Sequence, residues 1–240
     1  MFSMRNHLVA GMRVRVACAL SLALTAPLIA RKGKHPELTL PNILSKMDVA
    51  AKNLKTVSAK LEYTNFTALV NDTSTQKGEL YYRKGKGNKL PEILVDFKEP
   101  DRKKVRLYKG VGEFYLVKAN QVQVFKVQQN GDVLQQFLAL GFGTESAKLK
   151  KDYEIKYLGE EPLGDKTTAL LELTPKRKSA AGISKIQLWI SEDSWVPTQQ
   201  KFFKSAGDYT VAHYSRMQLK DALPESDFDL GAPKSAYPSK

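Results

Sequence analysis

The feature that most constrains the fold is a change in the spacing of apolar residues after residue 60. From there, most of the chain consists of short segments whose side chains alternate between two faces, separated by Gly, Asn, Asp and Pro. Alternation with a period of two is typical of half-buried β-strands, and near-regular spacing favours an antiparallel meander. The expected strands are the segments 61–70, 76–83, 92–97, 103–108, 113–120, 121–127, 153–165, 168–176, 183–191, 196–204 and 209–219.

A helix is expected before the strands. Apolar residues there recur at steps of three and four, which places them on one face of a helix. Thr39 suits the N-cap, and Pro41 suits the first turn, where a missing N–H is harmless. The opposite face carries both Lys46 and Asp48, so we expect the stripe to face the core and not a membrane. The stripe comprises Leu40, Leu44, Met47, Ala51 and Leu54.

The segment 130–152 interrupts the strand series. Asp132 can cap a short helix that carries Leu134, Phe137 and Leu138. Gly141 or Gly143 would end this helix. Thr144 could then cap a second helix that runs through Leu149. We therefore expect two short helices between the two halves of the sheet.

The first thirty residues have the composition of a secretory signal peptide. Arginines precede an uncharged run at 16–30 that is short for a membrane span and ends in small residues. We expect cleavage after Ala30, with a signal peptide at 1–30 and one domain at 31–240; a retained N-terminal anchor is the alternative. Removal of Arg5, Arg13 and Arg15 lowers the net charge from +13 to +10. Export makes the periplasm the expected location and nucleic acid an unlikely partner.

The single cysteine, Cys18, lies inside this signal segment. The expected mature chain therefore has neither disulfides nor thiol chemistry, and its stability must come from a packed core. A chain of 240 residues with 42% apolar residues is long enough to build such a core as a monomer.

A basic, glycine-containing run follows the second expected strand. The letters "YYRKGKGNKLPEI" span residues 81–93 and resemble a phosphate-binding loop only in composition. Such loops open a helix, whereas this run lies between two strands. Gly85 and Gly87 can supply the positive φ angles of a hairpin connection. The run is interpreted as a charged turn.

No pattern in the sequence indicates catalysis. His35 and His213 are the histidines of the mature chain, and no nucleophile motif accompanies Ser215, His213 and Asp208. Glu160 and Glu161 beside a proline are interpreted as a solvated turn. No His, Asp or Glu group has metal-ligand spacing. We expect a protein that is not an enzyme and uses neither metal nor cofactor.

The order of these parts resembles the periplasmic lipoprotein carriers of the Lol type and their lipoprotein-sorting relatives, over about residues 40–233. The first matching pieces are an amphipathic helix leading into "VSAKLEYTNFTALVND" and a Gly-x-Leu strand, "QKGELYYR". "EPDRKKVRLYKGVGEFYLVKANQVQVF" resembles the family's strand, Gly-centred turn and aromatic strand. The longest piece runs from "LLELTPK" to "YTVAHYSRMQL", and "DFDLGAPKSA" resembles the closing segment.

The resemblance implies a mainly β fold with short helices: an unclosed antiparallel β-barrel covered by a helical lid. It implies a non-catalytic carrier that binds lipoprotein acyl chains in an apolar cavity. Acylated lipoproteins, an inner-membrane exporter and an outer-membrane acceptor would be its partners. The residues expected to line the cavity are Leu44, Met47, Leu134, Phe137, Leu138, Ile186, Leu188 and Ile190. A filled core is the alternative for each of them.

The family's Gly-x-Leu strand ends in an arginine that contacts the lid. Here Arg83 lies one residue nearer to Gly78 than in the family pattern, and Lys84 follows it. A shift of one residue reverses the face on which a side chain lies. Arg83, Lys84 or neither could therefore be the lid latch.

Three other functions stay open at this point. The first is a periplasmic binding protein or sensor for another lipid or glycolipid, with the same fold. The second is a module that binds peptidoglycan or another polyanion through its positive charge. The third, a secreted hydrolase, is disfavoured by the missing catalytic motif.

Overall fold

The computed structural model describes residues 38–87, 89–126, 141–177, 182–204 and 206–238. The chain divides into two compact units, Met1–Glu37 and Leu38–Lys240, and every described residue belongs to the second.

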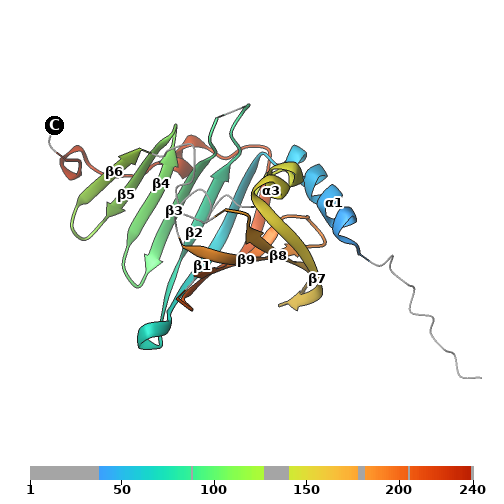
Figure 1. The fold of residues 1–240 in the computed structure, drawn as a ribbon. Coiled ribbons are helices and arrows are strands. Elements are labelled where there is room, and N and C mark those ends of the chain that lie inside the picture. Colours follow the sequence, from blue (N-terminus) through green and yellow to red (C-terminus); the bar gives the residue numbers. More distant parts are fainter. Residues whose placement is uncertain (1–37, 88, 127–140, 178–181, 205, 239–240) are drawn as a thin grey trace, which may run out of the picture. The chain divides into compact units, whose positions relative to one another are not determined.

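One antiparallel sheet dominates this unit (Figure 1). Its eleven strands are β1 (Thr56–Thr67), β2 (Asp72–Arg83), β3 (Glu92–Glu99), β4 (Lys103–Tyr108), β5 (Val111–Leu116), β6 (Gln121–Lys126), β7 (Tyr153–Leu163), β8 (Lys166–Pro175), β9 (Ile183–Ser191), β10 (Pro197–Lys204) and β11 (Tyr209–Lys220). Two α-helices, α1 (Leu40–Asn53) and α3 (Ser146–Asp152), and three 3-10 turns, η1 (Ala68–Val70), η2 (Glu225–Phe228) and η3 (Lys234–Ala236), complete the described elements.

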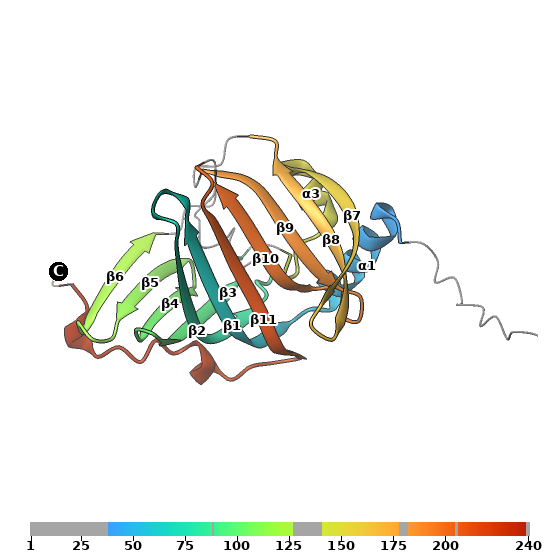
Figure 2. The ribbon, with the colours of Figure 1, turned by 90° about the horizontal axis from the view of Figure 1, so that it is seen from below.

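The strand order is β6-β5-β4-β3-β2-β1-β11-β10-β9-β8-β7, and Figure 2 shows the strands side by side in this order. Strands that are consecutive in the sequence pair with each other, except for β6 and β7. In addition, β1 pairs with β11, which joins the two halves of the sheet. Strands β6 and β7 are therefore the two edges of a sheet that does not close. The predicted fold class, a mainly β protein with an unclosed antiparallel sheet and short helices, is confirmed.

The strand boundaries differ from the sequence prediction at several points. Strand β1 begins at Thr56 and ends at Thr67, where the turn η1 replaces the last expected residues. Helix α3 begins at Ser146 with Glu145 at its N-cap, and not with Thr144. Period-two alternation locates a strand well but sets its ends poorly, because the end depends on partner length.

The charged run after β2 is a connection between β2 and β3, as predicted. Gly87 has a φ of +61°, which favours glycine. Gly85 does not have a positive φ; a Cβ there would lie 2.0 Å from the carbonyl oxygen of Lys89. Gly85 is thus required for a close approach of two backbone segments, which corrects the predicted reason for this residue.

Helix α1 lies on one face of the sheet, here called the inner face. Its buried residues Ile43, Leu44 and Met47 belong to the main hydrophobic cluster, together with the inward side chains of β1, β2, β3 and β8 to β11. Helix α1 therefore takes the place of a second sheet: it covers apolar side chains that would otherwise meet water.

The opposite face, the outer face, is covered at β3 to β6 by the C-terminal segment 223–237. Its apolar side chains form a second cluster with the sheet, comprising Leu94, Tyr115, Val122, Leu223, Phe228, Leu230 and Ala236. Strand β3 thus lies between two clusters, with Ile93 and Val95 inward and Leu94 outward.

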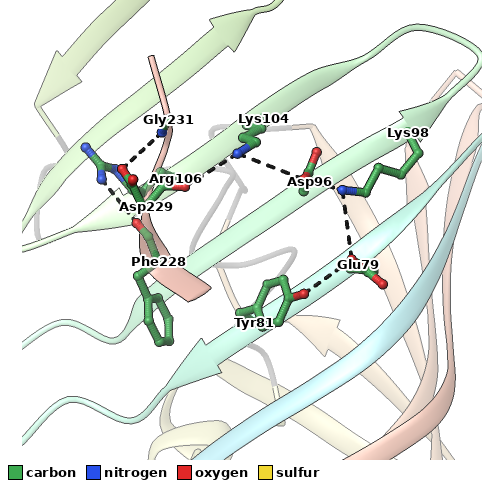
Figure 3. A network of polar contacts seen from close by, with 9 residues as sticks. All are labelled: Glu79, Tyr81, Asp96, Lys98, Lys104, Arg106, Phe228, Asp229 and Gly231. Carbon is green, nitrogen blue, oxygen red and sulfur yellow. Dashed lines mark hydrogen bonds and ion pairs between the residues drawn. The ribbon is translucent and has the colours of Figure 1, made fainter. Parts of the chain in front are cut away.

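Charged side chains fix this C-terminal segment to the sheet (Figure 3). Arg106 donates to Glu113 at 2.6 Å and to the carbonyl oxygen of Phe228 at 3.1 Å. Lys104 lies 4.0 Å from the carboxylate of Asp96 and 3.5 Å from the carbonyl oxygen of Asp229. Buried carboxylates on the outer face are thus paired with cations, as burial of a charge requires.

None of the helices within the described residues is both long and apolar enough to cross a membrane.

Candidate functional site

The inner face brings together five of the eight predicted cavity residues. Leu44 and Met47 from α1 and Ile186, Leu188 and Ile190 from β9 are each at most 2% exposed and lie in one hydrophobic cluster. The register pairs Leu188 with Gln200 on β10 and with Leu171 on β8, whose side chains face the same way. In this state the five side chains are packed, and their role as cavity lining stays a prediction. Leu134, Phe137 and Leu138 lie outside the described residues.

The two candidate latch residues point to opposite sides of the sheet. Lys84 Nζ donates to the carbonyl oxygen of Ala51, in the last turn of α1, at 2.6 Å. The last carbonyls of a helix lack intrahelical partners and favour a cation, so Lys84 caps α1. Lys84 thus contacts α1, and its role as the lid latch stays a prediction.

Arg83 belongs to the outer face. Its guanidinium donates to Glu92 at 2.8 Å, to Glu225 at 2.7 Å and to the carbonyl oxygen of Leu223 at 3.1 Å. It also lies 4.3 Å from the centre of the Phe228 ring. Arg83 therefore holds the C-terminal segment, and among the described residues it makes no hydrogen bond or ion pair with α1 or α3.

Helices α1 and α3 are joined by a carboxylate. Asp48 accepts a hydrogen bond from the backbone N–H of Ser146 at 2.6 Å and from its hydroxyl at 2.7 Å. The unpaired N–H groups at the start of α3 are thus satisfied by a side chain of α1. Asp48 is 98 residues from Ser146, and no short-range pattern in the sequence could have indicated this pair.

The residues that precede α3 are also tied to the inner face. Tyr82 donates to the carbonyl oxygen of Phe142 at 2.9 Å, and the Phe142 ring packs edge-on against Tyr214 with centroids 5.1 Å apart. Burial raises the pKa of both tyrosines above the usual value, so the hydroxyls stay protonated donors. Gly141 and Gly143, the residues expected to end the preceding helix, both have positive φ, +84° and +63°.

The inner face becomes more exposed to solvent at β4 to β6. The register places Val105, Phe114 and Phe125 on the same side as the core residue Leu107. Val105 and Phe114 are half-buried and Phe125 is exposed, whereas Leu107 is fully buried. An apolar surface thus continues from the packed region beneath α1 to a part that solvent reaches, which is the candidate site for an apolar ligand.

The part of the chain that the structure describes has no catalytic geometry around the histidine of β11. Asp208 accepts from the backbone N–H of Ala68 at 2.8 Å and stabilises the turn at η1. His213 lies opposite Glu62 and Gln199 in the register, and Ser215 is exposed. In the described parts of the chain, no three His, Cys, Asp or Glu side chains are grouped to hold a metal ion.

Comparison with known proteins supports the fold. A family model described as "-like: Uncharacterized protein" matches residues 143–209. A search of curated proteins found no match to the sequence. A conserved protein of Thermus thermophilus is 13% identical, with a TM-score of 0.52 over 82% of this chain and 96% of that one. The protein MucB is also 13% identical, with a TM-score of 0.52; the match covers 80% of this chain and 62% of MucB.

A LolA superfamily protein of Nitrosomonas europaea is matched as well, at 17% identity and a TM-score of 0.39 over 80% of this chain and 98% of that one. At such identities a likeness concerns the fold alone. The structures with a TM-score of 0.52 support the mainly β fold expected from the sequence.

Proposed function

We propose that the protein is a non-catalytic periplasmic carrier that binds lipoprotein acyl chains on the inner face and moves lipoproteins from the inner to the outer membrane. One observation supports this proposal most: inward apolar side chains continue from the buried Leu107 to the half-buried Phe114 and the exposed Phe125, beside the inward Gln121 and Gln123 of β6. A filled core that served stability alone would not need an apolar continuation open to solvent.

The free energies of burial favour replacement of helix α1 by an acyl chain. Uncovering Ile43, Leu44 and Met47 would cost about 5–9 kcal/mol, at roughly 1.5–3 kcal/mol for each buried side chain. A sixteen-carbon acyl chain gains about 12 kcal/mol on full burial, at roughly 0.8 kcal/mol per CH2. Helix α1 should therefore stay on the sheet without cargo and be displaced when an acyl chain enters.

The lid consists of helices α1 and α3, and its polar contacts are few. Within the described residues, α1 accepts the Lys84 bond, is joined to α3 by the Asp48 bonds, and places the Lys46 ammonium 4.2 Å from the Trp195 ring centre. Helix α3 adds two exposed contacts, from Lys176 to the carbonyl oxygen of Lys150 and from Arg177 to Asp152. A lid held mainly by apolar packing can release cargo, because the same packing re-forms as the chain leaves.

The same proposal defines the mature form of the carrier and the route of its cargo. The mature carrier would begin at Arg31, and the intact mass of protein purified from cells tests this boundary. It would receive acylated lipoproteins from an inner-membrane exporter and pass them to an outer-membrane acceptor, as a monomer.

The function is tested by a release assay. Inner-membrane vesicles that hold a tagged, acylated lipoprotein and its exporter are incubated with the purified protein, and the soluble fraction is examined. The expected result is soluble lipoprotein in a one-to-one complex with the carrier. Release of an unacylated version to the same extent would contradict a role for the acyl chains.

Loss of the Lys84 cap should make cargo exchange faster. Charge-assisted hydrogen bonds are worth about 1.5–3 kcal/mol, so Lys84→Met should speed handover to acceptor membranes roughly tenfold. Arg83→Met removes a cation from the neighbouring position but acts on the outer face, and it is the matched control. The measurement is the handover rate of a fluorescent lipoprotein. Equal handover rates in both variants would show that Lys84 is not the latch.

A further inference from the structure

Lys103 is a cation on the apolar inner face. In the register it lies between Phe97 of β3 and Leu116 of β5, both of which face inward. Its Nζ is 5.3 Å from the centre of the Phe97 ring and 6.0 Å from that of Phe114. The side chain is half-buried. A charged group therefore stands at the start of β4, among the apolar side chains that form the candidate site.

This cation differs from its neighbours on the outer face. There, Arg83 pairs with Glu92 and Glu225, Lys104 with Asp96, and Arg106 with Glu113. Among the described residues, no carboxylate lies within ion-pair distance of Lys103, and the adjacent Asp101 is 2.5 Å from Lys118. The aromatic rings offset part of the charge, but they leave donors of the ammonium without an acceptor.

The surroundings of Lys103 disfavour its charged form. Partial burial among apolar groups lowers the pKa of its ammonium, and the charge of Asp101 opposes this effect only in part. A group that is disfavoured in its charged form would be stabilised by an anion that binds beside it.

We propose that Lys103 binds the anionic headgroup of an amphiphile, a carboxylate or a phosphate, whose acyl chain lies along the inner face of β4. From Lys103 to Leu107 the strand passes Val105 and covers about 13 Å, at roughly 3.3 Å per residue. A chain anchored at Lys103 would therefore cross the half-buried Val105 and Phe114 and end over the buried core at Leu107.

This inference rests on the proposed function, since both place acyl chains on the inner face; it adds the charge of the headgroup. It also separates two kinds of cargo. The ester-linked chains of a lipoprotein carry no charge at the head, whereas a fatty acid or an acyl phosphate does.

The test compares three ligands with the same chain: oleate, oleyl phosphate and oleyl alcohol. Their Kd values are measured by displacement of a neutral fluorescent probe from the wild type and from Lys103→Met, Lys103→Arg and Arg102→Met. Lys103→Met keeps an unbranched side chain, Lys103→Arg keeps the charge, and Arg102→Met removes an exposed cation from the adjacent position. Circular dichroism checks that each variant is folded.

The anionic ligands should bind the wild type at least about tenfold more tightly than oleyl alcohol. This preference should disappear in Lys103→Met and persist in Lys103→Arg and Arg102→Met; the tighter of the two anions identifies the headgroup. Equal binding of all three ligands by the wild type would overturn the role of Lys103 and leave the carrier proposal intact. Binding of none of them would overturn both.

Discussion

Replacing Phe125 with aspartate should weaken fatty-acid binding by tenfold to a hundredfold while the protein stays folded. The Phe125 side chain lies on the inner face of β6, with its ring over Gly112 of β5, and is 37% exposed. The substitution removes an apolar contact worth about 1.5–3 kcal/mol. It also places a carboxylate beside the acyl chain, where its desolvation adds to the loss. Displacement of a fluorescent fatty acid measures the change in Kd.

The adjacent residue provides the control. Val124 lies on the outer face of the same strand and is 48% exposed. Val124→Asp introduces the same charge at nearly the same place, but away from the proposed chain. Its Kd should stay within about twofold of the wild type, because exposed substitutions seldom change the structure. Equal losses in both variants would mean that acyl chains do not contact the inner face of β6.

Replacing Phe142 with alanine should lower the free energy of unfolding by about 3–5 kcal/mol, the usual cost of emptying a large buried aromatic site. The ring is 1% exposed and lies between Tyr82 and Tyr214, at centroid distances of 5.8 and 5.1 Å. It connects the residues that precede α3 to the inner face of the sheet. Urea denaturation of the wild type and the variant measures the change.

A second aromatic gives the comparison for this variant. Phe66 stacks on Tyr209 at 4.8 Å but is half-buried at the end of β1. Phe66→Ala should cost about 1 kcal/mol, since its ring is already partly hydrated. A loss for Phe142→Ala no larger than that for Phe66→Ala would show that residue 142 does not fasten this segment to the core.

The sheet and its first helix could be predicted because their signals are local. Period-two alternation located all eleven strands, and the stripe that contains Leu44 and Met47 located α1. Both patterns depend on residues that are neighbours in the sequence. Gly87 in the hairpin after β2 could be assigned for the same reason, since a positive φ is a property of one residue.

The contacts of the lid could not be predicted because they join distant parts of the chain. Asp48 to Ser146 and Tyr82 to Phe142 span 98 and 60 residues. The sequence left Arg83, Lys84 or neither as the latch, and only the register of β2 decides which of the two side chains faces α1. The pairing of Lys103 with two inward aromatic residues likewise depends on the register of β3, β4 and β5.

The packing of the outer face is another feature that could not be predicted from the sequence. The closing segment resembles that of the carrier family in a few residues, but this resemblance does not indicate its packing on β3 to β6. Leu94, Tyr115 and Val122 alternate with inward residues, so the sequence indicates an outward side chain without saying what covers it. Only the return of 223–237 across these strands explains why both faces of β3 are buried.

The central claim is that acyl chains bind on the inner face, and native mass spectrometry of protein purified from membrane-containing lysate tests it most directly. The account predicts a mature chain carrying bound acyl-chain mass, which collisional activation releases as lipid or lipoprotein. It also predicts that Phe125→Asp reduces the bound fraction and that Val124→Asp does not. A wild-type spectrum that contains only the bare polypeptide, from protein that remains folded and monomeric, would contradict the account.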